Sequence, residues 1–100
     1  MINKNDILAF LRLNLPLLRS YYHVVRIGVF GSFARDEQRD DSDIDIIVEV
    51  EPGTADIHRL KNELREFIGT PFNRSVDIAR EKYLKPYART AILSEVIYVQ

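Results

Sequence analysis

The alternation of apolar and acidic residues over positions 43–50, Asp-Ile-Asp-Ile-Ile-Val-Glu-Val, constrains the fold more than any other stretch of the chain. Side chains of a β-strand point alternately to its two faces. The face that must be buried carries Ile44, Ile46, Val48 and Val50. Asp43 and Asp45 therefore lie side by side on the opposite face. Two neighbouring carboxylates repel each other unless a cation lies between them, and their oxygens are ligands that Mg²⁺ accepts.

A turn and two further strands accompany this segment. Residues 24–30 are rich in β-branched side chains and predict a buried strand. Gly31-Ser32 then turns the chain into a short helix, where free backbone N–H groups and the Ser32 hydroxyl suit a phosphate. Residues 75–79 predict a third strand, with Asp77 on the face opposite to its apolar side chains. If this strand lies beside residues 43–50, all three carboxylates converge, which indicates metal-assisted nucleotide chemistry.

The motif resembles the signature of the DNA polymerase β-like nucleotidyltransferases, in which Gly-Ser, Asp-x-Asp and a later Asp lie on successive strands. Ten residues separate Ser32 from Asp43, and the fuller strings 31–35 and 42–48 resemble the minimal branch of the family, called MNT. MNT proteins are commonly the antitoxins of HEPN–MNT toxin–antitoxin pairs. The sequence departs from the family at Asp36, where the family usually has glycine. Because this position lies in a loop and is no proposed ligand, the resemblance stands.

The resemblance implies a fold, a reaction and a partner. The fold would be α/β (α+β), a small mixed β-sheet flanked by helices of the polymerase β-like type, as one domain over residues 1–100. The donor substrate would be ATP, and AMP would pass to a tyrosine hydroxyl of a HEPN toxin in a hetero-oligomer. The expected site residues are Asp43, Asp45 and Asp77 for catalysis and for two Mg²⁺ ions, and Gly31, Ser32 and Arg35 for the nucleotide. Asp77 would also help to accept the proton of the attacking hydroxyl.

Arg35 has a physical rationale of its own. It lies at the end of the turn, where its guanidinium can pair with a phosphate or brace the loop. Most of the other charged residues between positions 35 and 42 are expected to be solvated.

Composition limits the alternatives. The chain has 100 residues, so its core is small and its stability can depend on a partner. A net charge of −1 argues against direct nucleic-acid binding, which needs a basic surface. The absence of cysteine excludes disulfides and thiol chemistry and agrees with a cytoplasmic location. No apolar run approaches the length of a membrane span.

The remaining sequence predicts helices around the strands. Asn3 or Asn5 can cap a first helix, which Pro16 interrupts or restarts. A helix capped by Thr54 and ended by Gly69 and Pro71 would cross over to the Asp77 strand. A last helix from Pro86 to Ser94 would precede a short strand. Tyr83, Tyr87 and Arg89 are of residue types that are enriched at partner surfaces, although simple packing is the stronger interpretation.

Three other interpretations of the sequence remain open. An antibiotic-modifying nucleotidyltransferase is disfavoured because known members carry an additional helical domain for the drug. A non-catalytic antitoxin would neutralise its toxin by contact alone, but such a protein has no reason to keep a complete motif. In the third interpretation the carboxylates are structural and pair with Arg35 and Arg80. The identity of the acceptor, the base preference and the stoichiometry of a complex do not follow from the sequence.

Overall fold

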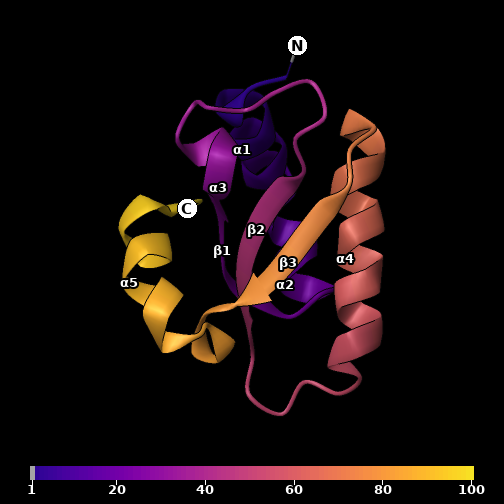
Figure 1. Ribbon diagram of the computed structural model, residues 1–100. Coiled ribbons are helices and arrows are strands. Elements are labelled where there is room, and N and C mark those ends of the chain that lie inside the picture. Colours follow the sequence, from indigo (N-terminus) through magenta and orange to yellow (C-terminus); the bar gives the residue numbers. More distant parts are fainter. Residues whose placement is uncertain (1) are drawn as a thin grey trace.

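A four-stranded mixed sheet forms the centre of the computed structural model, which describes residues 2–100 (Figure 1). The strands lie in the order β3-β2-β1-β4. Their bounds are Val24–Phe30 for β1, Ile44–Val50 for β2, Val76–Arg80 for β3 and Ile97–Tyr98 for β4. β1 is antiparallel to both β2 and β4, whereas β2 and β3 are parallel. The predicted mixed sheet with flanking helices is confirmed.

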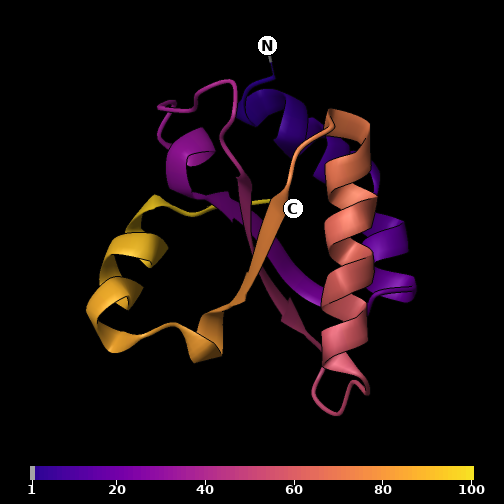
Figure 2. The same cartoon turned by 45° about the vertical axis from the view of Figure 1, so that its right-hand side comes forward.

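Helices cover both faces of the sheet. Their bounds are Lys4–Leu13 for α1, Leu15–Ser20 for α2, Gly31–Ala34 for α3, Ile57–Phe72 for α4, Glu81–Tyr83 for the 3₁₀ turn η1 and Pro86–Glu95 for α5. Figure 2 shows α1, α2 and α4 on one side of the sheet and α5 on the other. None of the helices within residues 2–100 has the length and apolar character needed to cross a membrane.

The core lies between the sheet and the layer of α1, α2 and α4. The four predicted core residues of β2, together with Leu11, Phe33 and Leu64, are all buried there. Ile47 is also buried, but it does not belong to this core cluster. Because it alternates with its neighbours, Ile47 faces the side of the sheet that carries Asp45 and α5.

The first two helices begin as the sequence predicts. Asn3 caps α1, and its side chain and the Asp6 side chain each accept a hydrogen bond from the other residue's backbone N–H. Pro16 lies in the first turn of α2 and separates this helix from α1.

The predicted ends of α4 are wrong. Thr54 does not cap the helix, because its hydroxyl donates to the Glu51 carbonyl (2.6 Å), and α4 begins only at Ile57. At the other end, the helix continues through Gly69 and Pro71 as far as Phe72. A Cβ at Gly69 would lie 2.5 Å from the Arg74 carbonyl oxygen. This glycine therefore allows α4 to approach the segment before β3 closely rather than ending the helix.

Candidate active site

The ends of three strands bring the predicted carboxylates to one edge of the sheet. The crossover through α4 makes β3 parallel to β2, and the register pairs Asp45 with Asp77. On its other side Asp45 pairs with Phe30, the last residue of β1. Asp43 lies one residue before β2, so the expectation that it belongs to the strand is wrong by one position. Asp43 and Asp77 are exposed, and Asp45 is partly buried.

Negative charge accumulates around Asp45. The pKa of the Asp45 carboxyl is raised to about 6, firstly by partial burial and then by the carboxylates of Asp77, Asp43 and Glu95, in that order of importance. Arg35 is the cation that opposes them. A surplus of carboxylate oxygen at this edge fits a hard divalent cation such as Mg²⁺. Among residues 2–100 no three acidic, histidine or cysteine side chains form a group that could hold a metal ion, so the predicted ligand set remains a prediction.

Gly31 is required where β1 turns into α3. Its φ of +75° lies in the left-handed region that side chains disfavour. A Cβ at this position would overlap the Asp45 carboxylate. The absence of a side chain therefore lets the turn lie directly against Asp45. The helix that follows has only four residues, so the Gly31 N–H, rather than a helix dipole, is the donor that the turn offers.

Glu95, the last residue of α5, is the site residue that sequence reasoning missed. Its Oε2 atom accepts hydrogen bonds from the Gly31 backbone N–H (3.0 Å) and from Arg35 Nη1 (2.7 Å). No local pattern marks this glutamate, because it lies 64 residues from Gly31 and only the return of the chain to β1 brings it here. Its carboxylate is one of the groups that raise the pKa of Asp45.

Arg35 braces the loop that leads to the carboxylates, one of the two roles considered for it. Its Nε donates to Glu37 (3.1 Å) and its Nη1 to Glu95. These hydrogen bonds, the one to Glu37 first, raise the pKa of the Arg35 guanidinium. The predicted nucleotide-binding residues Gly31 and Arg35 are thus linked through a shared carboxylate, while Ser32 lies between them in α3.

The loop between α3 and β2 is held at two points. Asp36 adopts a φ of +58°, a left-handed conformation that suits glycine and that aspartate tolerates. Its carboxylate pairs with Lys4 of α1 (3.0 Å). Further along, Arg74 donates to the carbonyl oxygens of Arg39 (3.2 Å) and Ser42 (2.9 Å). These contacts fix the loop immediately before Asp43.

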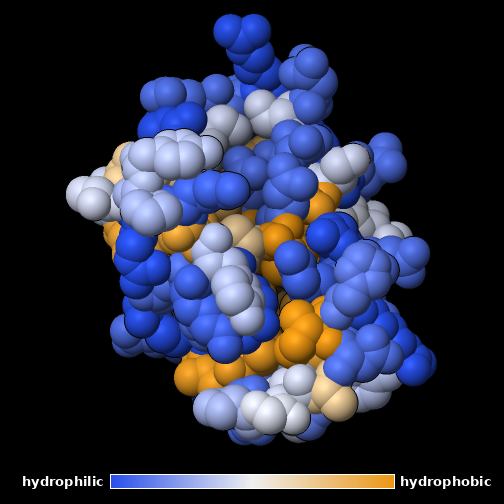
Figure 3. All heavy atoms as spheres, turned by 60° about the horizontal axis from the view of Figure 1, so that its bottom comes forward, coloured by the Kyte–Doolittle hydropathy of each residue, from blue (hydrophilic) through white to orange (hydrophobic). Residues whose placement is uncertain are grey.

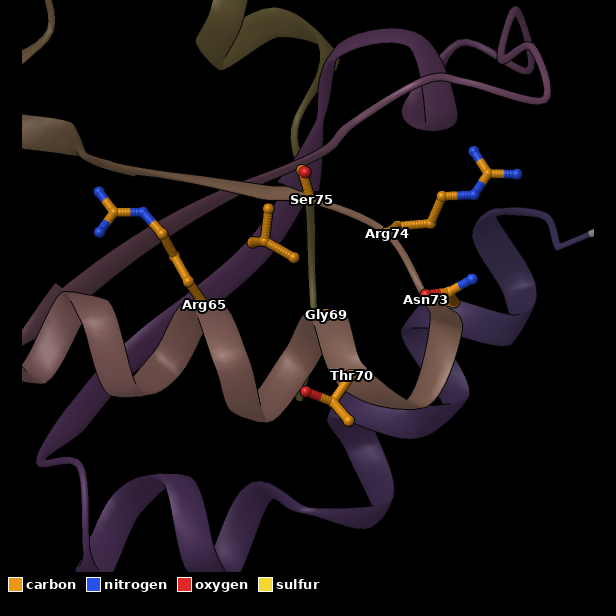
Figure 4. Close-up of a pocket in the computed structure, with 7 residues that line it drawn as sticks. Arg65, Gly69, Thr70, Asn73, Arg74 and Ser75 are labelled. Carbon is orange, nitrogen blue, oxygen red and sulfur yellow. The ribbon is translucent and has the colours of Figure 1, made fainter.

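A cavity of about 540 Å³ lies away from these carboxylates, between the end of α4 and the start of β3. Arg65 and Arg74 both line it, but Figure 4 shows their guanidinium groups pointing in different directions. None of the predicted site residues lines this cavity. This cavity is therefore separate from the candidate active site.

The mixed sheet, the turn at Gly31 and the paired carboxylates define a nucleotidyl-transferring type of domain. The family model described as "Nucleotidyltransferase domain" matches residues 13–99, and the chain belongs to this family. Protein adenylyltransferase MntA of Thermococcus cleftensis is 33% identical over 99 residues, which cover 99% of this chain and 98% of the relative. The family resemblance and the enzyme class inferred from the sequence are confirmed.

Solved structures share the fold. A structure assigned as a minimal nucleotidyltransferase has a TM-score of 0.76 and 32% identity, with 96% of this chain and 95% of that chain covered. A complex of tri-AMPylated HEPN toxin with MNT antitoxin from Shewanella oneidensis contains a chain with a TM-score of 0.58 and 21% identity. The match covers 98% of this chain and 69% of that chain, and at this identity it shows the fold alone.

Proposed function

We propose that this nucleotidyltransferase uses ATP and Mg²⁺ to transfer AMP to a tyrosine hydroxyl of a partner HEPN toxin, and so acts as an antitoxin. The observation that carries the proposal is the position of the Gly31 turn directly against Asp45, which itself faces Asp77 across the β2–β3 pair. A turn whose N–H groups suit a phosphate and a pair of carboxylates thus lie at one edge of the sheet, which supports the proposal. The adenylyltransferase name of the Thermococcus relative supports AMP as the transferred group, and the AMPylated toxin in the Shewanella complex supports a HEPN toxin as the acceptor protein.

Each site residue has a role in this proposal. Asp43, Asp45 and Asp77 would hold Mg²⁺, which when bound neutralises the triphosphate and makes an attacking hydroxyl more acidic. The Gly31 N–H, the Ser32 hydroxyl and the Arg35 guanidinium would donate hydrogen bonds to the phosphate oxygens. No described residue of the site is assigned to the base of the nucleotide, and the base preference stays open.

The reaction balances as a displacement at phosphorus. The phenolic oxygen of the acceptor tyrosine forms a bond to the α-phosphorus, and the bond from that phosphorus to the bridging oxygen of the β-phosphate breaks. Pyrophosphate leaves with the bonding electrons, and the phenolic proton passes to a carboxylate, for which Asp77 is the proposed acceptor. The toxin then carries AMP on its tyrosine.

Transfer from α-labelled ATP tests the proposal. The chain is incubated with a HEPN-type protein as the candidate acceptor, with Mg²⁺ or with EDTA. We expect Mg²⁺-dependent label on a partner tyrosine, and a loss of at least about 100-fold in Asp45→Asn and Asp77→Asn, since both substitutions remove proposed ligand oxygens. Asp41→Asn, which neutralises an exposed carboxylate two residues before Asp43, is the matched control and should transfer normally.

Two results would contradict the proposal. Undiminished AMP transfer in Asp45→Asn would show that the reaction does not require the Asp45 carboxylate. Neutralisation of the toxin without any label on it would favour the alternative, an antitoxin that acts by contact.

A further inference from the structure

A carboxylate of the protein already occupies the donors that a phosphate would use. Glu95 Oε2 accepts both the Gly31 N–H and an Arg35 N–H. The Glu95 side chain is only 19% exposed, whereas Glu37, the other partner of Arg35, is 62% exposed. Carboxylate and phosphate oxygens compete for the same charged and backbone donors. A bound phosphate and Glu95 therefore exclude each other at these two N–H groups.

The end of the chain holds Glu95 in this position. Val99 N donates to the Ile27 carbonyl (2.9 Å), and β4 pairs with Gly28 and Val29 of β1. A Cβ at Gly28 would lie only 2.8 Å from the Ile97 carbonyl oxygen and 2.9 Å from Val96 Cγ1. The C-terminal segment thus lies closely against β1 at a glycine, and this antiparallel pairing places the end of α5 beside Gly31.

The rest of α5 is held less firmly than its last residue. None of its side chains is fully buried, although Arg89 near its middle pairs with Glu81 (3.6 Å). Figure 2 shows α5 on the opposite side of the sheet from α1, α2 and α4. The Glu95 side chain can therefore leave Gly31 without the loss of a buried apolar contact of this helix.

We propose that Glu95 is an internal competitor of the nucleotide, which holds the Gly31 and Arg35 donors in the nucleotide-free protein and must be displaced before a phosphate binds there. This inference rests on the proposed nucleotide-binding role of Gly31 and Arg35. Glu95 then determines the affinity for nucleotide in two ways. It occupies the donors directly, and its negative charge beside Asp45 repels the incoming triphosphate.

Glu95→Gln tests the competition because glutamine keeps the shape and a carbonyl acceptor but loses the charge. Calorimetric titrations with MgATP and with inorganic tripolyphosphate are compared for the unsubstituted chain, Glu95→Gln and Glu37→Gln. We expect Glu95→Gln to bind both ligands about tenfold more tightly, since a charge-assisted hydrogen bond no longer has to be broken. Glu37→Gln also removes a carboxylate charge that is paired with Arg35, but this residue does not contact the Gly31 N–H. This variant should change the Kd for either ligand less than about threefold.

A second measurement uses the unsubstituted chain and does not depend on how a variant folds. The Gly31 amide and the Glu95 side-chain carboxyl carbon are followed by NMR during the MgATP titration. Both signals should move together and reach saturation at the same ligand concentration, because one event frees the carboxylate and occupies the amide.

The outcomes separate this inference from the proposed function. Unchanged or weaker binding in folded Glu95→Gln, or no binding of either ligand to any of the three proteins, overturns the competitor role. Tighter binding in Glu95→Gln without AMP transfer to a partner would leave the competitor role in place and remove the proposed reaction. AMP transfer by the unsubstituted chain, with no effect of Glu95→Gln on the affinity for nucleotide, would support the proposed reaction and overturn the competitor role.

Discussion

Asp45 is the residue at which the demands of the site oppose those of folding. Its carboxyl is partly buried and faces three other carboxylates, with Arg35 as the opposing cation. A neutral isostere removes both the cost of desolvation and the repulsion. We therefore expect Asp45→Asn to raise the free energy of unfolding by about 1 kcal/mol at pH 7.5 in EDTA. This is less than the full free energy that corresponds to the pKa shift, because Asp45 is partly exposed and solvent screens its charge.

The pH dependence of this effect has a definite sign. The Asp45 carboxyl binds its proton more tightly in the folded state, with a pKa of about 6 against an ordinary value of 3.8. The carboxylate consequently lowers the stability of the unsubstituted chain as the pH rises through this window. In urea unfolding the advantage of Asp45→Asn should be complete above about pH 6 and absent below about pH 4. An advantage that does not vary with pH would contradict this electrostatic origin.

Gly31 and Gly53 form a matched pair for separating backbone strain from steric overlap. Both have positive φ, +75° and +82°, but only Gly31 faces another group, the Asp45 carboxylate, whereas Gly53 has nothing within 4 Å. We expect Gly53→Ala to cost about 1 kcal/mol through φ alone. Gly31→Ala should cost roughly 1–3 kcal/mol more and displace Asp45, with loss of nucleotide transfer. Equal unfolding free energies for the two variants would show that the turn yields to the added methyl group.

At the scale of elements, α1 depends on the face that it buries. A helix of ten residues is marginal by itself in water, so packing must stabilise it. Leu11 is 0% exposed within the core, whereas Leu13 at the end of the same helix is 80% exposed. We expect Leu11→Ala to lower the free energy of unfolding by about 2–4 kcal/mol and Leu13→Ala by less than about 0.5 kcal/mol. Comparable losses in chemical denaturation would contradict the burial pattern.

Helix α4 shows where element prediction from local signals fails. The glycine and proline near its end are ordinary stop signals, and Thr54 is an ordinary cap. In the structure Gly69 is needed for close approach to the segment before β3, and Pro71 is accommodated in the final turn. Local propensities cannot distinguish a glycine that ends a helix from one that a neighbouring segment requires. The interior of α4 was nevertheless predictable, because its apolar residues recur at helical spacing.

At the scale of the whole molecule, the two faces of the sheet differ in character. Three helices pack over the core on one face, and the other face carries Asp45, Ile47 and α5, none of whose side chains is fully buried (Figures 1 and 2). Apolar residues also reach the surface at the end of the molecule shown in Figure 3. Among the described residues, the exposed large apolar side chains outside the candidate active site include Leu13, Leu17 and Val25.

The sequence by itself determined the strands, the buried face of β2 and the motif of Gly31, Asp45 and Asp77, because alternation and turn chemistry are local properties. The crossover to the Asp77 strand was also predictable, since a helix lies between the two strands, and the structure shows that this pair is parallel. Tertiary structure alone decided that Glu95 would meet Gly31 and Arg35. That contact depends on the path by which the chain returns to β1, and no periodicity or spacing encodes a contact between residues 64 positions apart.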